Sequence, residues 1–169
     1  LLYMITKAAN RIPELRQRIV DDGIVQYDWC QSSFTVALED ETYRYCVVPA
    51  DLPFDEYVKQ ARILQEEAKQ CERLIDKGDP LSYFYVSSVP WASFSSLSLP
   101  AENNRFSVPC ITPGKYYSEE KVVLHEGTLG VEKHIILPLS IMVNHAIVDG
   151  RHIARFYTEL EDCMHDFIK

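Results

Sequence analysis

The sequence has little positive charge and no long hydrophobic run. Its formal net charge is −8, which argues against a nucleic-acid-binding surface and against a polybasic membrane patch. No apolar stretch approaches the roughly 18 uncharged residues that a membrane-spanning helix requires. Internal repeats and low-complexity tracts are absent as well. These absences predict a globular protein that binds neither nucleic acid nor membrane.

The cysteines lack the spacing of a metal site. They are odd in number and scattered, and no secretory segment is present, so we expect a reducing, cytoplasmic setting and no metal ion. The five are Cys30, Cys46, Cys71, Cys110 and Cys163.

Apolar and aromatic side chains are plentiful. Hydrophobic residues make up 47% of the 169, and the chain has ten tyrosines, seven phenylalanines and two tryptophans. This length and composition fit a single domain over residues 1–169 with ample material for a core. The chain starts without methionine and within a helical pattern, so we expect an N-terminally truncated protein.

Hydrophobic periodicity predicts both helices and strands. Apolar residues three and four apart indicate helices over 1–10, 54–77 and 153–167. Residues 93–107 are too polar for core and too long for a tight turn, which is typical of a functional loop. The expected strands are 24–29, 33–38, 43–48, 83–89, 110–112, 121–124 and 135–143.

The clearest functional pattern lies where the last strand meets the last helix. An apolar run ends in a short polar break that holds His145 and, four residues later, Asp149 followed by Gly150. A histidine held between rigid elements beside apolar walls suits acid–base chemistry. The alternative is structural: an ordinary turn histidine, an aspartate that caps the helix and a glycine that permits an unusual backbone angle. The combined pattern His-x-x-x-Asp-Gly favours the functional interpretation.

A general base also needs a partner that stabilises the negative charge of the transition state. Ser87 is a candidate, because it lies late in a strand that reads as buried, where a free hydroxyl needs a partner. From the residues alone, a hydrogen bond to a neighbouring backbone carbonyl is the simpler explanation.

Four blocks of sequence resemble the chloramphenicol acetyltransferase family, in the family's order. Residues 137–156, which contain Asn-His-Ala-Ile-Val-Asp-Gly, are similar to its C-terminal signature. Residues 86–96 are similar to its Ser-x-x-Pro-Trp-x-x-Phe-x-Ser segment, 109–117 matches a third block, and 10–28 reads like its Glu-Leu-Arg region. Measured against the resembled family, roughly the first quarter of the protein is missing.

The resemblance implies a fold and an activity. The fold would be the two-layer α/β (α+β) sandwich of coenzyme A-dependent acyltransferases. The activity would be O-acetyl transfer from acetyl-coenzyme A to a hydroxyl of chloramphenicol. His145 would be the general base, although the family usually has two histidines where this chain has Asn144 and His145.

Three further residues take roles by the same resemblance. Ser87 aligns with the serine that stabilises the oxyanion, and Thr112 with a threonine that positions a water. Asp149 aligns with a structural aspartate whose arginine partner lies in the missing N-terminal part, so we expect it to be unpaired here.

The resemblance also implies two sets of binding residues. Trp91, Lys115 and Tyr116 would contact the adenine and phosphates of the coenzyme. The acceptor pocket would be lined by mostly apolar side chains, for which ordinary core is the alternative interpretation. These are Thr35, Tyr85, Leu97, Phe106, Val108 and Cys110.

Family members are trimers with active sites between subunits, so we expect a homotrimer in which His145 faces an acceptor pocket supplied largely by a neighbouring subunit.

Segment 121–133 is longer than the usual family hairpin, which predicts an altered rim of the coenzyme channel. Three alternatives stay open: an acetyltransferase of this fold for another alcohol, a folded but inactive truncated core, or a dihydrolipoyl acyltransferase-like core. The Pro90-Trp91 block argues against the last.

Overall fold

A computed structural model of the protein describes residues 1–72, 78–100, 106–125 and 127–168. Its centre is a five-stranded sheet in the order β4-β3-β5-β6-β9. Strands β3, β5 and β6 run parallel, whereas β4 and β9 are antiparallel to their neighbours. The bounds are β3 (Gln31–Ala37), β4 (Tyr43–Val48), β5 (Tyr83–Val86), β6 (Cys110–Pro113) and β9 (Leu139–Met142).

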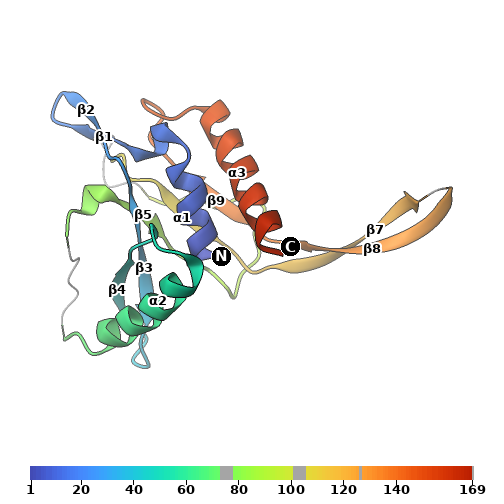
Figure 1. The fold of residues 1–169 in the computed structure, drawn as a ribbon, viewed down its shortest axis with the longest axis horizontal. Helices are drawn as coiled ribbons and strands as arrows, with labels where there is room; N and C mark the ends of the chain where they lie inside the picture. Colours follow the sequence, from blue (N-terminus) through green and yellow to red (C-terminus); the bar gives the residue numbers. More distant parts are fainter. Residues whose placement is uncertain (73–77, 101–105, 126, 169) are drawn as a thin grey trace.

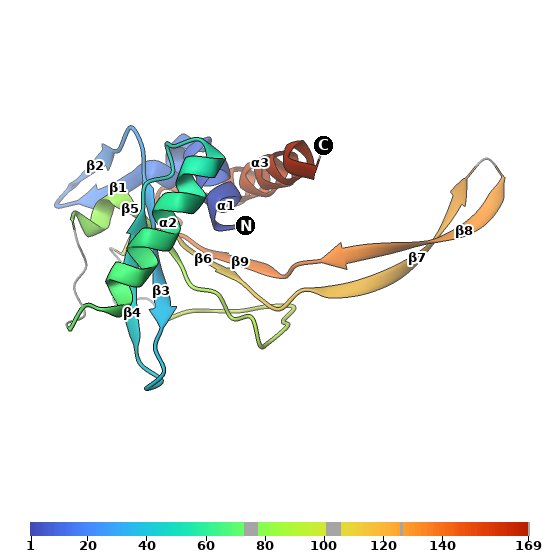
Figure 2. The same cartoon turned by 60° about the horizontal axis from the view of Figure 1, so that its bottom comes forward.

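The helices pack on one face of this sheet (Figures 1 and 2). In the described residues these are α1 (Leu2–Asn10), α2 (Phe54–Lys69) and α3 (Gly150–Ile168). Phe84 of β5 and Phe156 of α3 belong to one buried core, which α1 completes, and a second core joins α2 to β4. The predicted two-layer α/β sandwich is therefore confirmed.

Because successive side chains of a strand point to opposite sides of a sheet, the residues on the second face of this sheet can be identified. Phe84, Val86 and Ile111 belong to the helix-side core, so Tyr85, Cys110 and their same-parity neighbours point the other way. No helix in the described residues contributes to a core on that side. We call it the open face.

A small hairpin is anchored at one end of the sheet. It follows α1 and the 3-10 helix η1 (Pro13–Arg16), and consists of β1 (Gln17–Val20) and β2 (Gly23–Gln26). The side chain of Arg18 is fully buried at its base. Its guanidinium donates four hydrogen bonds of 2.7–2.8 Å to backbone carbonyls, those of Leu15, Gln17, Leu81 and Tyr83. Leu81 belongs to the 3-10 helix η2 (Pro80–Ser82), and Tyr83 is the first residue of β5.

A long hairpin projects from the other end of the sheet, well clear of the body of the molecule (Figures 1 and 2). It consists of β7 (Tyr117–His125) and β8 (Thr128–Ile136), which pair antiparallel over their whole length. The chain enters the hairpin from β6 and returns from it into β9. The hairpin is thus an extension of the β6–β9 pair.

The structure corrects three expectations about the elements. The helix predicted over 54–77 ends at Lys69, and past its end the carbonyl of Cys71 accepts a hydrogen bond from Arg44 Nε at 2.7 Å; residues 73–77 lie outside the described part. The strand predicted over 135–143 is interrupted between β8 and β9, because Pro138 has no N–H for a ladder. Strand β2, expected to be half-buried, is exposed along its length.

Candidate functional site

Two predicted site residues lie side by side at one end of the open face. The Ser87 N–H donates to the Ile111 carbonyl at 3.1 Å, so Ser87 continues the β5–β6 pairing beside Thr112. Thr112 is buried, and its hydroxyl finds no hydrogen-bond partner among the described residues. Ser87, expected to be buried, is exposed just past the end of β5. We call this the Ser87 end of the sheet.

The expected acceptor residues gather on the open face. Tyr85 is paired in register with Cys110 and its ring stacks on Phe106 at 6.4 Å between centroids. In β3, Phe34 is paired with Val86 of β5, so the next residue, Thr35, lies beside Ser87. Val108 comes two residues before Cys110, on the same side by strand alternation, but its side chain is almost fully buried. The set therefore forms one surface, with Val108 in the core beneath its edge.

Two residues that sequence reasoning did not assign hold loop segments over this surface. Ser140 Oγ donates to the Leu97 carbonyl at 2.9 Å, and Asn144 Nδ2 donates to the Phe106 carbonyl at 3.0 Å. Both come from β9 or the residues just after it, so the segment that resembles the family's C-terminal signature holds the residues around Leu97 and Phe106. Their place within that signature was the signal that could have found them.

The expected coenzyme contacts lie beyond the Ser87 end. The Lys115 N–H donates to the Ala92 carbonyl at 2.8 Å, which joins the segments that carry Trp91 and Tyr116. Gly114 makes this approach possible, since a Cβ there would come within 2.6 Å of Phe94 Cε1. The side chain of Trp91 is 78% exposed and that of Tyr116 is 67% exposed, so both are available for stacking.

His145 lies at the opposite end of the sheet from Ser87. Ser140 is paired with Thr112 and Met142 with Cys110, so β9 carries the chain away from Ser87. His145 comes three residues after Met142, where β9 ends, and so lies past the end of the sheet that is remote from Ser87. It is exposed in a turn that an Ile147 N–H to Asn144 carbonyl hydrogen bond closes at 3.1 Å. The structure therefore does not bring His145 and Ser87 of one chain together.

Asp149 caps α3. Its Oδ1 accepts hydrogen bonds from the backbone N–H groups of Arg151 at 2.9 Å and His152 at 3.3 Å. These hydrogen bonds, that of His152 foremost, hold the pKa of the Asp149 carboxyl below its usual value. The capping interpretation is confirmed, and the expectation of an unpaired aspartate is wrong because the first turn of the helix supplies its partners.

We predict that Asp149→Asn lowers the melting temperature slightly at pH 7 and leaves the active-site chemistry intact. Asparagine still caps a helix, but it lacks the charge that favours an N-terminus. Because the folded pKa lies below the unfolded one, this stabilisation is present above about pH 4 and is lost as the pH falls below it. Thermal melts from pH 7 to pH 3 check this, with Asp162→Asn on the exposed side of the same helix as control. A gap that persists undiminished at pH 3 would contradict the role.

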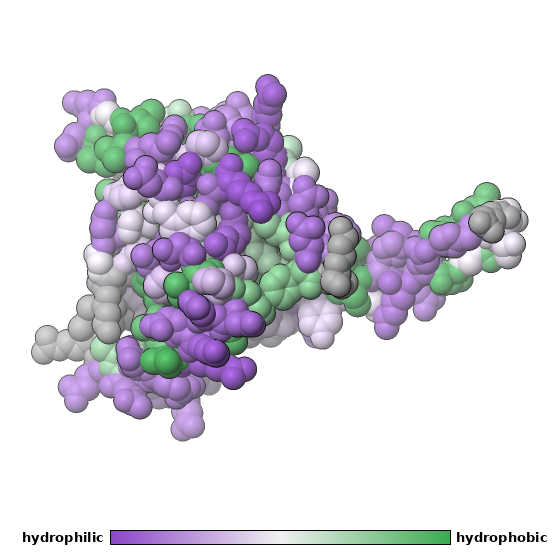
Figure 3. Space-filling model, viewed as in Figure 1, coloured by the Kyte–Doolittle hydropathy of each residue, from purple (hydrophilic) through white to green (hydrophobic). Residues whose placement is uncertain are grey.

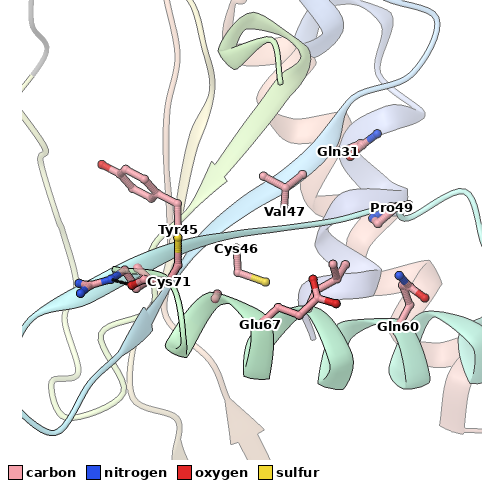
Figure 4. Close-up of a pocket in the computed structure, with 11 residues that line it drawn as sticks. Gln31, Tyr45, Cys46, Val47, Pro49, Gln60, Glu67 and Cys71 are labelled. Atoms are coloured by element: carbon pink, nitrogen blue, oxygen red, sulfur yellow. Dashed lines mark hydrogen bonds between the residues drawn. The ribbon is translucent and has the colours of Figure 1, made fainter. Parts of the chain in front are cut away.

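A cavity of about 280 Å³ lies away from this surface, between β4 and α2 (Figure 4). Its lining includes Cys46 and Val47 of β4, Leu64 of α2, and Cys71. None of the predicted site residues is among the described residues that line it. The cavity is therefore separate from the candidate site.

In the described residues, no group of three or more His, Cys, Asp or Glu side chains is arranged to hold a metal ion. None of the helices in those residues combines the length and the hydropathy that crossing a membrane requires.

Comparison with known proteins gives one consistent family. The family model described as "Chloramphenicol acetyltransferase" matches residues 1–161. The chain is 30% identical to "Chloramphenicol acetyltransferase 3" of Escherichia coli, covering 100% of this chain and 75% of that protein. It is 31% identical to a chloramphenicol acetyltransferase of Clostridium perfringens, covering 96% and 74%.

Solved structures give the same fold. A chloramphenicol acetyltransferase matches with a TM-score of 0.70 and 26% identity, covering 96% of this chain and 74% of that one. A probable dihydrolipoamide acetyltransferase from Listeria monocytogenes matches with a TM-score of 0.69 over 98% of this chain and 68% of that one. At 16% identity the second likeness concerns the fold alone.

Proposed function

Because this chain belongs to the chloramphenicol acetyltransferase family, we propose that it moves the acetyl group of acetyl-coenzyme A to a hydroxyl of chloramphenicol. The observation that carries the proposal is the composition of the open face. Three features share it: exposed Ser87, the stacked pair Tyr85–Phe106, and Thr112, whose hydroxyl has no hydrogen-bond partner in the described part of the chain. An apolar surface with a few polar groups at one end suits a nitrophenyl alcohol.

The mechanism is direct acyl transfer. The imidazole of His145 removes the proton from the acceptor hydroxyl while its oxygen attacks the thioester carbonyl. Ser87 Oγ donates a hydrogen bond to the oxyanion of the tetrahedral intermediate. When the intermediate collapses, the C–S bond breaks and the imidazolium returns the proton to the departing thiolate. No acyl-enzyme forms, so none of the cysteines takes part.

His145 and Ser87 of each site come from different subunits. Their placement at opposite ends of one sheet supports this, because a single chain cannot present both to one substrate. The Ser87 end of one subunit then meets the His145 end of the next. Such a head-to-tail contact joins two different surfaces, and it gives a closed ring when the rotation between neighbours is a whole fraction of a turn; we propose a rotation of one third, the homotrimer. We further propose one domain over residues 1–169 and a cytoplasmic location.

The proposal is tested by release of coenzyme A thiol from acetyl-coenzyme A, with and without chloramphenicol, beside a panel of other primary and secondary alcohols. Release that depends on chloramphenicol supports it. Release with another alcohol only would leave the chemistry in place and replace the acceptor. No release with any alcohol, from a protein that is folded and assembled, would overturn it.

We predict that Ser87→Ala lowers kcat by about 10²- to 10³-fold, since removing one oxyanion donor has that effect at comparable sites. KM should change little, because the interaction strengthens only in the transition state. Ser88→Ala is the matched control: this neighbouring serine is also exposed, and strand alternation turns it away from Ser87. Equal rates for the two variants would remove Ser87 from the mechanism.

A further inference from the structure

The turn that carries His145 is held by hydrogen bonds at both of its ends. We call residues 144–149 the His145 turn. Three of its backbone N–H groups, those of positions 146 to 148, donate to Asn144, either to Oδ1 or to the backbone carbonyl, at 3.0–3.1 Å. The N–H of Asp149 donates instead to a side chain, His152 Nδ1, at 3.1 Å. The shape of the turn therefore depends on Asn144 at its start and on His152 beyond its end.

Asp149 and His152 bond each other reciprocally. Asp149 Oδ1 accepts the backbone N–H of His152 at 3.3 Å, while the His152 ring accepts the backbone N–H of Asp149. This is the arrangement of a capping box, in which a glutamate or glutamine at the third helical position usually takes the place of the ring. Imidazole has a second nitrogen on the far side of the ring. His152 can therefore cap α3 and contact another element at the same time.

The second nitrogen of His152 faces η1. Nε2 lies 3.5 Å from Glu14 Oε1, and the side chains of His152 and Glu14 are only 21% and 27% exposed. The other carboxylate oxygen of Glu14 is buried and has no hydrogen-bond partner among the described residues. By contrast, Arg151 and Arg155 of the same helix are exposed, and Figure 3 shows mainly hydrophilic colour around the start of α3, at the top of the view. His152 is thus directed inward, from a mainly polar surface toward η1.

These contacts determine where the ring carries its proton. Nδ1 must be free of hydrogen to accept the Asp149 N–H, so the proton of the neutral ring lies on Nε2, the nitrogen that faces the Glu14 carboxylate. Asp149 Oδ1 also lies 3.1 Å from Nδ1, but that oxygen already accepts two backbone N–H groups. The Asp149 N–H has no second acceptor in the described part of the chain. The ring therefore connects the end of the His145 turn to a carboxylate on η1.

We propose that His152 is a positioning residue that, together with Glu14, fixes the His145 turn on η1 and so places the base against the acceptor hydroxyl. The inference rests on the proposed function, which makes His145 the base. The start of the turn is already fixed, because Asn144 Nδ2 donates to the Phe106 carbonyl at 3.0 Å. His152 fixes the other end. A misplacement of a reacting group by about 1 Å can lower a rate by about 10²-fold, so supporting contacts of this kind decide how precise a site is.

Two measurements test the contacts of His152 without turnover. Nuclear magnetic resonance of protein with isotope-labelled histidine, at about pH 8, should show a neutral His152 ring with its proton on Nε2; the His152→Ala variant assigns the signal. A proton on Nδ1 would overturn the proposal. Hydrogen exchange followed by mass spectrometry should show the amides of the His145 turn exchanging about fivefold faster or more in His152→Ala. Unchanged exchange would also overturn it.

The kinetic test is thiol release with chloramphenicol, measured below the melting temperature of every variant. His152→Ala should lower kcat by about 10- to 100-fold with little change in KM, because the base is misplaced while the acceptor surface is intact. His152→Gln should recover most of the loss, since glutamine at this helical position accepts the same N–H. Arg155→Ala, at an exposed position of the same helix, is the control and should match the wild type. A His152→Ala variant that melts earlier but keeps its kcat would show a purely structural role.

Glu14→Ala tests the contact with η1 and should lower kcat in the same direction. Combined with His152→Ala it should cost no more than His152→Ala alone, because both residues act through one ring. Independent losses that multiply would contradict this. A folded, assembled wild type that releases no thiol with any alcohol would end the proposed function only, since the proton position and the amide exchange still decide whether His152 holds the turn.

Discussion

Replacing His145 by alanine should lower kcat by roughly 10⁴-fold, the upper end of what general acid–base catalysis contributes. The upper end applies because the same imidazole takes the acceptor proton and later returns it to the thiolate. Imidazole suits both steps, since it changes charge near neutral pH. The side chain is exposed in its turn, so the variant should keep the fold, the melting temperature and the assembled mass of the wild type.

His165→Ala is the matched control, because that histidine is exposed farther along α3 and has no assigned role. Thiol release and the thermal melt are measured on both variants. Turnover of His145→Ala within tenfold of the wild type would show that another group is the base.

A mixing experiment sharpens the result. If each site takes Ser87 from one subunit and His145 from the next, inactive His145→Ala and inactive Ser87→Ala subunits that are unfolded and refolded together can form intact sites. With equal amounts and random assembly, a site has both wild-type residues with probability one half times one half, so about a quarter of the wild-type activity should return. If both residues of a site came from one chain, nothing would return.

Replacing Arg18 by alanine should lower the free energy of unfolding by about 3 kcal/mol or more, because each buried carbonyl left without its donor costs on the order of 1–3 kcal/mol. The guanidinium is fully buried and holds four carbonyls from η1, β1, η2 and β5. Without it these acceptors lose their donor and a cavity remains. A loss of this size is a large part of the stability of an ordinary domain.

Urea unfolding at one fixed protein concentration measures the effect, because assembly also stabilises the chain. Arg18→Lys should recover little, since an ammonium cannot reproduce the planar fork. Arg62→Ala, at an exposed position of α2, should change stability by less than about 0.5 kcal/mol. An Arg18→Ala variant as stable as this control would contradict the anchoring role.

Much of the fold could be predicted because local patterns and tertiary packing agree. The periodicity of residues 1–10 marks the helix that is present, and its predicted apolar face carries the buried Ile5 and Ala8. Prediction failed where an element's limits depend on distant partners. Helix α2 ends at Lys69, and just past its end the carbonyl of Cys71 accepts a hydrogen bond from Arg44 of a separate strand, a contact that no local pattern predicts.

The candidate site likewise has features that the sequence predicts and features that depend on distant segments. Strand parity places Tyr85 and Cys110 on one surface, where the ring of Tyr85 stacks on Phe106, and the role of these residues in binding the acceptor stays a prediction taken from family resemblance. The roles of Ser140 and Asn144 could not be foreseen, because each acts by bonding a carbonyl about forty residues away in the chain.

The sequence by itself determined which groups the chain has for chemistry, and which strands and helices carry them, because residue type and periodicity are local properties. Only the tertiary structure decided that Ser87 and His145 lie at opposite ends of one sheet, that Asp149 caps a helix, and that the segment after β6 projects as a long hairpin. Those outcomes depend on strand order and register, which arise from packing between segments far apart in the chain.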